Sequence, residues 1–372
     1  MNDNIIRDLG NGLILRHAAV EDTEELVAFQ GDVHREPGSK EPEKWIASWT
    51  RDLMTKEHPT FDLDDFILVE DTTTGAIVST LGIFSQTWTY EGVPFGVGRP
   101  ELIGTLPDYR RRGLVRTQME VFHDRSAEHG ELVQAITGIP WYYRQFGYEM
   151  GMALGGGRIG YVSQKPKLKD GEKEPYHVRP AVEDDLPYIA RVGEYGDQRS
   201  LVSCVRDQAM WRHDLDGRSK QSIDRRELCI LETPEGKPVG FFTHFSSLWR
   251  NRLAASIYEL EPGVSWLAVT PTVVRHLWAK GQELAVQNPK QDMEAIAFWM
   301  GEEHPVYQVF RKQLPQSIEP YAWYMRVPDL PGFLRHISPV LEQRLAESVI
   351  AGHSGELFIS FYRDGLRLVL VD

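Results

Sequence analysis

The residues best suited to chemistry lie in the stretch Glu101–Val115, which reads ELIGTLPDYRRRGLV. We expect an apolar strand to end at Pro107, a short polar turn to follow, and Gly113 to open an amphipathic helix. The first amides of a helix lack partners within it, and the helix dipole favours an anion beside them. Gly113 has no β-carbon, so backbone can approach a ligand closely, and the arginines at 110–112 add positive charge. This pattern predicts a pyrophosphate site.

The elements that must position this turn alternate between strands and helices. Apolar periodicity predicts strands at 13–16, 66–70, 76–84, 95–105, 133–137 and 148–154, and helices at 20–33, 42–54, 114–128 and 142–146. This order is typical of an α+β fold with a mixed α/β sheet. A helical bundle and a sandwich of sheets are both excluded.

Three weak echoes in the sequence indicate an internal repeat. RHAAVED at 16–22 recurs as RPAVED at 179–184 with one residue deleted, WTRDL at 49–53 as WRHDL at 211–215, and PWYYRQF at 140–146 as PVYQVF at 305–310. Val20 and Val182 of the first pair are 162 residues apart, as are Trp49 and Trp211 of the second, and Pro140 and Pro305 of the third are 165 apart. Because the echoes keep one order at nearly one separation, they predict two copies of one domain.

The repeat and the local composition divide the chain into four parts. The predicted parts are a first domain at 1–164, a charged, Pro-bearing linker at 165–175, a second domain at 176–328 and a C-terminal unit at 329–372. In the last unit we expect a helix at 331–345. A hairpin should follow, with strands at 357–362 and 366–371 around Arg363-Asp364-Gly365.

The second copy lacks the chemical features of the first. Its equivalent of the turn, Ala268–Arg275, contains neither glycine nor a basic run. Thr270-Pro271-Thr272 is still a reasonable helix start. We therefore expect a degenerate domain that supports the fold and helps to wall a substrate cleft.

Composition narrows the partners and the compartment. The 372 residues carry a formal charge of −13, which disfavours nucleic acid and favours cationic small molecules. No apolar run is long enough to span a bilayer, and the N-terminus does not resemble a secretory signal. Cys204 and Cys229 cannot build a disulfide framework, and no His/Cys cluster shows zinc-ligand spacing. We expect a cytoplasmic protein without membrane association or metal.

The run Arg110–Val115 resembles the acetyl-CoA motif of the GNAT acetyltransferase superfamily, [Gln/Arg]-x-x-Gly-x-[Gly/Ala], with Val115 at the last small position. The longer pattern Pro-x-Tyr-Arg-Arg-Arg-Gly-Leu, with Tyr143–Tyr148 (YRQFGY) downstream, is similar to the family of enhanced intracellular survival (Eis) proteins. That resemblance covers essentially the whole chain. It implies two tandem GNAT domains, the second degenerate, and then a sterol-carrier-like unit, here truncated at Asp372.

The resemblance also implies which residues bind acetyl-CoA. Strand backbone at Ile103, Gly104 and Thr105 would pair with the pantetheine arm. The turn that holds the pyrophosphate would comprise Arg111, Arg112, Gly113, Leu114, Val115 and Arg116. Gly138 and Ile139 would add a further cofactor contact, and Tyr143 would be the general acid.

Acetyl transfer to an amine requires three further functions. An alkyl ammonium, with a pKa near ~10.4, must lose a proton before it attacks a thioester. The leaving thiolate, whose conjugate acid has a pKa near ~8.5, can take a proton from a phenol such as Tyr143. The tetrahedral oxyanion needs an N–H donor, for which Thr105 is a candidate.

The general base is less evident. The resemblance assigns it to the chain's terminal carboxylate, but a chain that ends at Asp372 within a hairpin strand cannot safely inherit that role. Glu101 is the alternative, because residues 101, 103 and 105 of a regular strand share one face. It would relay the proton through water.

Each candidate also has a simpler interpretation. The basic turn can be a solvated loop, Tyr143 a structural aromatic, and Glu101 an ordinary carboxylate at a strand end. Asp32, His34 and Glu36 follow the first helix, where the substrate cleft of such folds opens, and can equally be surface charges.

We expect an N-acetyltransferase that moves acetyl from acetyl-CoA to a primary amine of a cationic small-molecule acceptor. The resemblance suggests an aminoglycoside, a polyamine or a lysine-like group, and a ring-shaped homo-oligomer (hexamer). Two rivals stay open: a non-catalytic acyl-CoA-binding or sensor protein, and a lipid or sterol carrier acting through the C-terminal unit.

Overall fold

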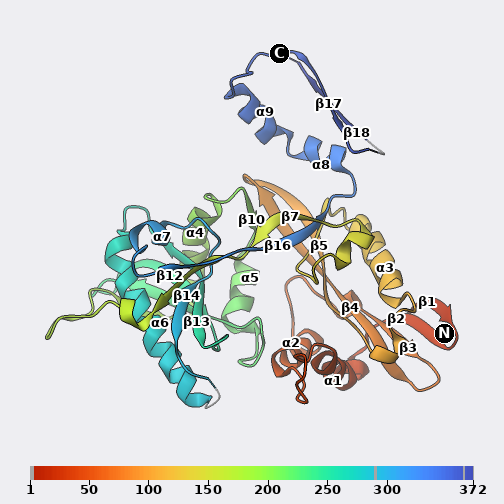
Figure 1. The fold of residues 1–372 in the computed structure, drawn as a ribbon, viewed down its shortest axis with the longest axis horizontal. Helices are drawn as coiled ribbons and strands as arrows, with labels where there is room; N and C mark the ends of the chain where they lie inside the picture. The colour runs from red at the N-terminus through yellow and green to blue at the C-terminus, as the bar shows by residue number, and fades with distance from the viewer. Residues whose placement is uncertain (1–3, 289–290, 363–364, 372) are drawn as a thin grey trace.

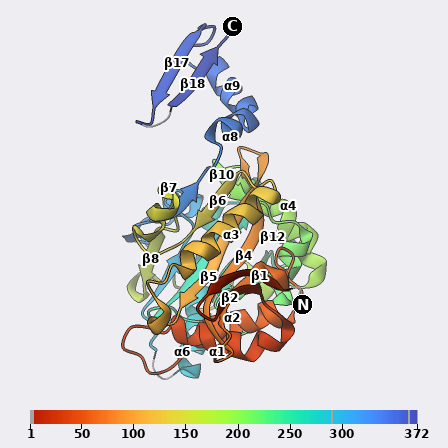
Figure 2. The same ribbon diagram turned by 90° about the vertical axis from the view of Figure 1, so that its right-hand side faces the viewer.

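Two mixed sheets, each covered by helices on both faces, make up the body of the molecule (Figure 1). The computed structural model describes residues 4–288, 291–362 and 365–371. A small C-terminal unit projects from the body in both views (Figure 2). The predicted α+β class is confirmed.

The first sheet has the strand order β1-β2-β3-β4-β5-β6-β16-β7, and β10 pairs with the end of β4. Its strands are β1 (Ile5–Gly10), β2 (Leu13–His17), β3 (Phe66–Asp71), β4 (Ala76–Tyr90), β5 (Val93–Thr105), β6 (Val133–Ile136), β7 (Glu149–Leu154), β10 (Val202–Cys204) and β16 (Tyr321–Arg326).

Helices cover the first sheet on both sides, which explains the uninterrupted apolar run of β3. Helices α1 (Thr23–Val33) and α2 (Lys44–Thr55) pack on one face, where Phe66 and Leu68 join their core. Helix α3 (Leu114–Glu128) packs on the other face, where Ile67 joins its core. Successive β3 side chains thus alternate between two buried layers.

The second sheet repeats this plan, with the order β15-β8-β14-β13-β12-β11-β9. Its strands are β8 (Gly157–Tyr161), β9 (His177–Pro180), β11 (Arg226–Glu232), β12 (Pro238–Phe245), β13 (Arg252–Leu260), β14 (Ala295–Phe298) and β15 (Gln316–Ile318). The helices are α4 (Leu186–Asp197) and α5 (Gln208–Arg212) on one face, and α6 (Trp266–Gln287) and α7 (Pro305–Val309) on the other.

The two sheets exchange strands across the boundary that the sequence predicts. Strand β8 falls within the range 1–164, yet it pairs with β14 and β15 of the second sheet. Strand β16 falls within 176–328, yet it lies between β6 and β7 of the first sheet. The composition of a linker shows where one segment of the chain ends, but it does not show which strands pair. The sequence therefore does not predict this exchange.

The repeat is visible in matching polar contacts. Arg16 binds Asp22 at 2.7 Å and Glu70 at 2.6 Å. In the second copy Arg179 binds its partners Asp185 and Glu232 at 2.6 Å and 2.7 Å. The arginine and the aspartate are six residues apart in both copies. The alignment with one deletion, which paired Asp22 with Asp184, is therefore wrong by one residue.

The C-terminal unit contains α8 (Leu330–His336), α9 (Ser338–Ala346) and the hairpin of β17 (Gly355–Ser360) and β18 (Gly365–Leu370). The single helix predicted at 331–345 is wrong: it divides at Ile337, two residues before Pro339, which has no N–H to continue it. The hairpin is confirmed, although Arg363 and Asp364 of its turn lie outside the described residues. No described helix has the length and apolarity needed to traverse a bilayer.

Candidate functional site

The site is an opening between the two central parallel strands of the first sheet. Strands β5 and β6 pair at Val97–Val133 and at Gly98–Gln134, and past these pairs they separate. A pocket of about 940 Å³ occupies the gap, between Glu101–Thr105 on one side and Ile136–Ile139 on the other. Because β5 has no strand partner along this edge, its backbone groups are available to an extended ligand.

A bulge shapes β5 beside the pocket. Thr80 lies opposite Gly104 and Gly82 opposite Glu101, so Leu81 faces two residues of β5, and Leu102 has φ of 52°. Leu102 consequently packs with α1 and α2, whereas Ile103 packs with α3.

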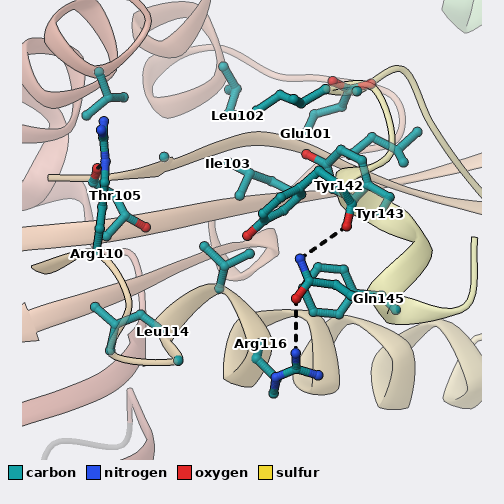
Figure 3. A pocket seen from close by; sticks show the side chains of 18 of the residues that line it. Glu101, Leu102, Ile103, Thr105, Arg110, Leu114, Arg116, Tyr142, Tyr143 and Gln145 are labelled. Atoms are coloured by element: carbon teal, nitrogen blue, oxygen red, sulfur yellow. Dashed lines mark hydrogen bonds between the residues drawn. The ribbon is translucent and has the colours of Figure 1, made fainter. Parts of the chain in front are cut away.

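The bulge corrects the prediction that residues 101, 103 and 105 share one face. Glu101 lies opposite Gly82 on the side of Leu102, and Ile103 points to the other side (Figure 3). A non-glycine residue at positive φ has no clear sequence signature, which is why regular alternation gave the wrong face.

Along the free edge of β5, alternate residues direct their backbone N–H and carbonyl groups toward the pocket. The Leu106 N–H donates to the Val78 carbonyl of β4 at 3.0 Å. Since neighbouring residues of a strand direct their backbone groups to opposite edges, Ile103 and Thr105 direct theirs toward the pocket. The Arg110 side chain confirms this for Thr105, because its Nε donates to the Thr105 carbonyl at 3.2 Å.

The turn before α3 presents a row of open amides. Gly113 is the N-cap at φ 81°, and Arg111 also has a positive φ of 63°. The first backbone bond of the helix runs from the Thr117 N–H to the Gly113 carbonyl at 3.1 Å. Within the described chain the amides of Leu114–Arg116 therefore have no helical acceptor, and they lie at the pocket. This arrangement can hold an anion.

The arginines of the turn differ in their roles. Arg110, Arg111 and Arg116 line the pocket, and Arg116 donates to Gln145 Oε1 at 3.0 Å (Figure 3). Arg112 is not among the lining residues: it donates to the Asp108 carbonyl at 2.9 Å and stacks on Tyr109. The pocket is thus lined by every predicted cofactor residue except Arg112, namely Ile103, Gly104, Thr105, Arg111, Gly113, Leu114, Val115, Arg116, Gly138 and Ile139.

Tyr143 lies at the opposite end of the pocket from Thr105 and Arg110 (Figure 3). It belongs to the 3₁₀ helix Tyr142–Phe146, and its side chain is buried beside Gly138. Burial raises the pKa of the Tyr143 phenol, and the nearby Glu101 charge raises it further. The phenol therefore keeps its proton at neutral pH and can donate it.

The second copy holds the Tyr143 end of the pocket in place. On β16 the buried Tyr324 hydroxyl accepts the Trp141 N–H at 2.5 Å, and the Tyr324 ring packs 6.0 Å from the Tyr143 ring. From the same strand Tyr321 donates to the Gly138 carbonyl at 3.0 Å. The strand exchange therefore fixes the loop that carries two predicted cofactor residues and the predicted acid.

Glu101 lines the pocket near Tyr143, with its carboxylate bonded to Arg99. Burial raises the pKa of Glu101, and the Arg99 charge opposes that shift. A carboxyl group with a raised pKa is better matched to proton transfer near neutral pH than an exposed one. The alternative base, the terminal carboxylate of Asp372, lies outside the described residues.

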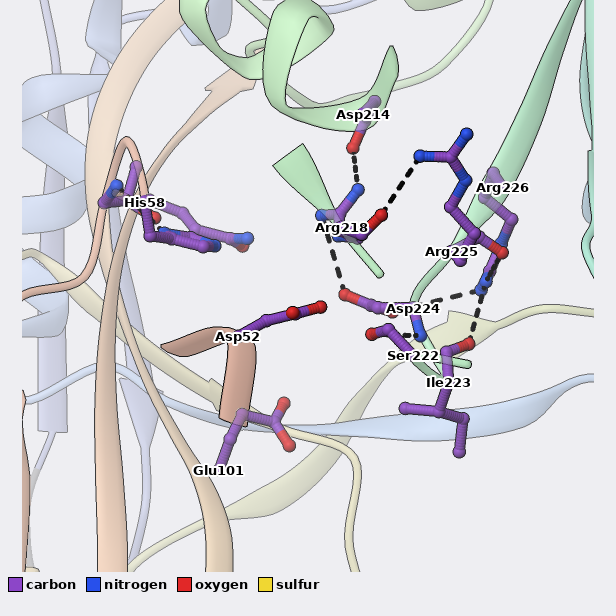
Figure 4. A network of polar contacts seen from close by, with 12 residues as sticks. Asp52, His58, Glu101, Asp214, Arg218, Ser222, Ile223, Asp224, Arg225 and Arg226 are labelled. Atoms are coloured by element: carbon purple, nitrogen blue, oxygen red, sulfur yellow. Dashed lines mark hydrogen bonds and ion pairs between the residues drawn. The ribbon is translucent and has the colours of Figure 1, made fainter. Parts of the chain in front are cut away.

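A network of charged residues from both halves of the chain lies next to Glu101 (Figure 4). Asp52 of α2 accepts from the Ser219 N–H at 2.7 Å, which ties α2 to the second half. Arg218 binds Asp214 and lies 3.6 Å from Asp224. The Asp224 charge contributes to the raised pKa of Glu101, so the two carboxyl groups lie close enough to influence each other.

Aromatic rings fill part of the equivalent opening in the second sheet. Strands β13 and β14 pair from Arg252–Ala295 to Ala255–Phe298 and then separate. Trp266 packs there against Tyr258 and His304, with ring centroids 4.8 Å and 5.1 Å apart. Helix α6 begins at Trp266 and includes Pro271, so the predicted start at Thr270 is wrong. A second pocket, of about 1080 Å³, nevertheless lies beside these rings, and its lining includes Tyr258, Glu259 and His304.

Several pocket residues escaped the sequence analysis. They are Val33, Leu102, Tyr109, Ile136, Thr137, Tyr142, Gln145 and Phe146. Arg110, which the sequence analysis counted among the basic residues of the turn, lines the pocket as well. His34, but neither Asp32 nor Glu36, lines the pocket, and burial lowers its pKa.

Central parallel strands that separate beside an open helix N-terminus form a pocket suited to an extended ligand with an anionic group. Residues 15–151 match the family model described as acetyltransferase (GNAT) domain. That part of the chain, which contains β5, β6, α3 and Tyr143, is accordingly a GNAT acetyltransferase domain. No curated protein sequence matches the chain significantly.

Solved structures share the fold over most of the chain. A GCN5-related N-acetyltransferase from Kribbella flavida is 15% identical, with a TM-score of 0.61 over 97% of this chain and 83% of that one. A GCN5-related N-acetyltransferase from Anabaena variabilis is 12% identical, with a TM-score of 0.60 over 96% and 83%. The Saccharomyces cerevisiae N-myristoyltransferase with bound myristoyl-CoA is 11% identical, with a TM-score of 0.59 over 87% and 81%.

Proposed function

We propose that this protein is an N-acetyltransferase that moves an acetyl group from acetyl-CoA to a primary amine of a cationic small molecule. One observation carries the proposal: a single pocket joins the open amides of the α3 turn, the free edge of β5 and the Tyr143 phenol. These three features match the pyrophosphate, the pantetheine arm and the thioester of one extended substrate.

Acetyl-CoA would lie along the opening between β5 and β6. The amides of Leu114–Arg116 and the Arg111 side chain would hold the pyrophosphate, since both supply donors or positive charge to that end of the pocket. The backbone of Ile103 and Thr105 would pair with the amides of the pantetheine arm. Arg110 would release the Thr105 carbonyl, which it occupies in the structure, to admit this partner.

The reacting groups would meet at the Tyr143 end. The acceptor's neutral amine attacks the thioester carbon, and the Ile103 N–H stabilises the oxyanion that forms. Ile103 suits this role better than Thr105, because it lies beside Tyr142 and Tyr143 whereas Thr105 lies beside Arg110 (Figure 3). The intermediate then collapses, the C–S bond breaks, and Tyr143 gives its proton to the departing thiolate.

Glu101 would accept the amine's proton through a water molecule and pass it to solvent. Its carboxylate lies on the α1–α2 side of β5, toward the second half of the chain. The acceptor would therefore enter from the interface between the halves. Asp224 is the carboxylate there that is best placed to attract a second ammonium group, because its side chain is 45% exposed and its arginine contacts are long, at 3.6 Å and 4.0 Å.

The test is a release assay for free thiol, in which the full chain is supplied with acetyl-CoA and a panel of aminoglycosides, polyamines and lysine peptides. The proposal predicts amine-dependent thiol release and a mass increase of one acetyl group on the acceptor. Saturable acetyl-CoA binding without amine-dependent release would instead indicate an acyl-CoA sensor.

The wider likeness to the Eis family is also a proposal. Two GNAT-like halves and a C-terminal unit support it. That unit contacts the first half where His336 donates to the Pro94 carbonyl at 2.7 Å and Phe333 packs on Phe95. The proposal includes a homo-oligomer in the cytoplasm, and light scattering coupled to size-exclusion chromatography tests the first part: a monomeric mass would refute it.

A further inference from the structure

The second half of the chain carries a group of buried ligand atoms that the proposed reaction does not use. Cys229 on β11, His244 on β12 and His276 on α6 face one another between the sheet and the helix. The Cys229 sulfur and one ring nitrogen of each histidine all lie within 4.8 Å of one another. We propose that these three residues form a zinc site in the degenerate domain.

The fold brings the three residues together from separate elements. Cys229 lies opposite Phe242 in the β11–β12 ladder, so His244, two residues further along β12, occupies the same face as its diagonal neighbour. The His276 ring reaches this face from α6, with its centroid 5.8 Å from that of His244. Sequence separations of 15 and 32 residues conceal the group from a search for zinc-ligand spacing.

The hydrogen bonds of the histidines prepare them as ligands. The His244 Nδ1–H donates to the Phe245 carbonyl at 2.8 Å, which leaves the Nε2 lone pair free to coordinate. A backbone carbonyl in this position is the usual support of a metal-binding histidine. His276 Nε2 is buried and has no hydrogen-bond partner among the described residues. A buried imidazole nitrogen without a partner, in a residue grouped with a thiol, is the feature that a metal would explain.

The geometry suits a small tetrahedral ion after modest side-chain rotation. Zinc bonds of about 2.0–2.3 Å require ligand atoms about 3.5 Å apart, so atoms that lie up to 4.8 Å apart would close by up to about 1.3 Å. Two nitrogens and one sulfur form a borderline-soft set that favours zinc over calcium or magnesium. On binding, the Cys229 thiol loses its proton to solvent and forms the Zn–S bond.

The surroundings supply an entry route and a candidate fourth ligand. Cys229 and His244 are buried, whereas His276 is partly exposed and opens the site to solvent. Glu227 lies directly opposite His244 in the ladder and can provide a carboxylate. Lys280, one turn beyond His276, is the nearby cation, and Glu283 binds it at 2.9 Å and offsets its charge.

Cobalt substitution of the full chain tests the site. After treatment with a chelator, titration with Co²⁺ should saturate at one ion per chain and produce a thiolate-to-cobalt charge-transfer band with tetrahedral d–d bands. Cys229→Ser should abolish the charge-transfer band. Cys204→Ser, at the other cysteine, is the matched control and should leave the spectrum unchanged.

A second variant keeps the test independent of Cys229. Changes to the supports of a ligand typically cost 10–100-fold in affinity, so loss of a ligand in His276→Gln should weaken Co²⁺ binding by at least about 100-fold. Zn²⁺ should compete with Co²⁺ for the wild-type chain. A folded wild-type chain that gives no charge-transfer band, or a spectrum that Cys229→Ser leaves unchanged, would overturn the proposal.

Discussion

The ring of Tyr143 lies against Gly138 so closely that a β-carbon on residue 138 would be 1.9 Å from Tyr143 Cε2. Gly138, a predicted cofactor residue, and Tyr143, the predicted acid, therefore pack directly against each other. The Tyr143 side chain is also buried and packs near the Tyr324 ring of the exchanged strand β16, so it has little room to move away. The position of the phenol depends on the absence of a side chain at 138.

Gly138→Ala should therefore displace the Tyr143 ring. Overpacking of this kind costs about 1–3 kcal/mol, and a catalytic group misplaced by about 1 Å can lose about 100-fold in rate. We expect kcat/KM to fall by at least about 10-fold in the thiol-release assay. In a Tyr143→Ala background the same change should cost little more, because the clash is gone. Equal losses in both backgrounds would contradict the pairing.

Tyr143→Phe should lower kcat by roughly 100-fold and leave the affinity for acetyl-CoA nearly unchanged, because only the acidic proton is removed. Steady-state kinetics and equilibrium binding separate the two effects. Tyr142→Phe is the matched control, since its ring also lines the pocket. A Tyr143→Phe enzyme with the full wild-type rate would remove the phenol from the mechanism.

Glu101→Gln should remove the acidic limb of the pH profile of kcat. The carboxylate is the active form of a base, and burial raises the pKa of Glu101, so the wild-type rate should rise with pH through a value above the ~4.3 of a free glutamate. The variant should be about 100-fold slower at neutral pH and lack that rise. If it keeps both the limb and the rate, another group is the base.

The paired rings of His58 and His213 should make stability depend on pH at the interface between the halves. Their centroids are 4.4 Å apart, and burial is the main cause that lowers the pKa of His58 to about 3 and of His213 to about 4. An unfolded histidine has a pKa near ~6.5. Between these values the unfolded chain binds more protons, so stability is complete above pH ~6.5 and falls as the pH drops toward 4.

Thermal unfolding measured from pH 7 to pH 4 checks this sign. The wild-type Tm should fall on acidification, and the double variant His58→Asn, His213→Asn should show a shallower fall. His353→Asn, at an exposed residue of the C-terminal unit, is the control and should follow the wild type. Parallel curves for the double variant and the wild type would show that the pair does not set the dependence.

The sequence was most informative where structure is local. The helix at 114–128 and the short helix at 142–146 have the predicted bounds, because periodicity and the adjacent turn residues define them. The same local motifs predict a site that includes Gly113 and Tyr143, and both residues line the pocket.

Features set by distant partners escaped prediction. The pairing of Arg326 with Gln134 joins segments 192 residues apart, and no pattern in β16 indicates the sheet that it joins. The bulge at Leu102 turned Glu101 to an unexpected face, and the contact of Arg112 with the Asp108 carbonyl took that side chain away from the pocket. Each depends on three-dimensional neighbours rather than on residue type.

Calorimetric titration of the folded chain with coenzyme A tests whether the turn before α3 binds the pyrophosphate. We expect saturable binding of one CoA per chain, lost in Gly113→Glu because the carboxylate would oppose the phosphates. Space around residue 113 is open, so Gly113→Ala shares the backbone strain at φ 81° without the charge and should keep most of the affinity. Absence of saturable binding to the wild-type chain would contradict a coenzyme A site at this turn.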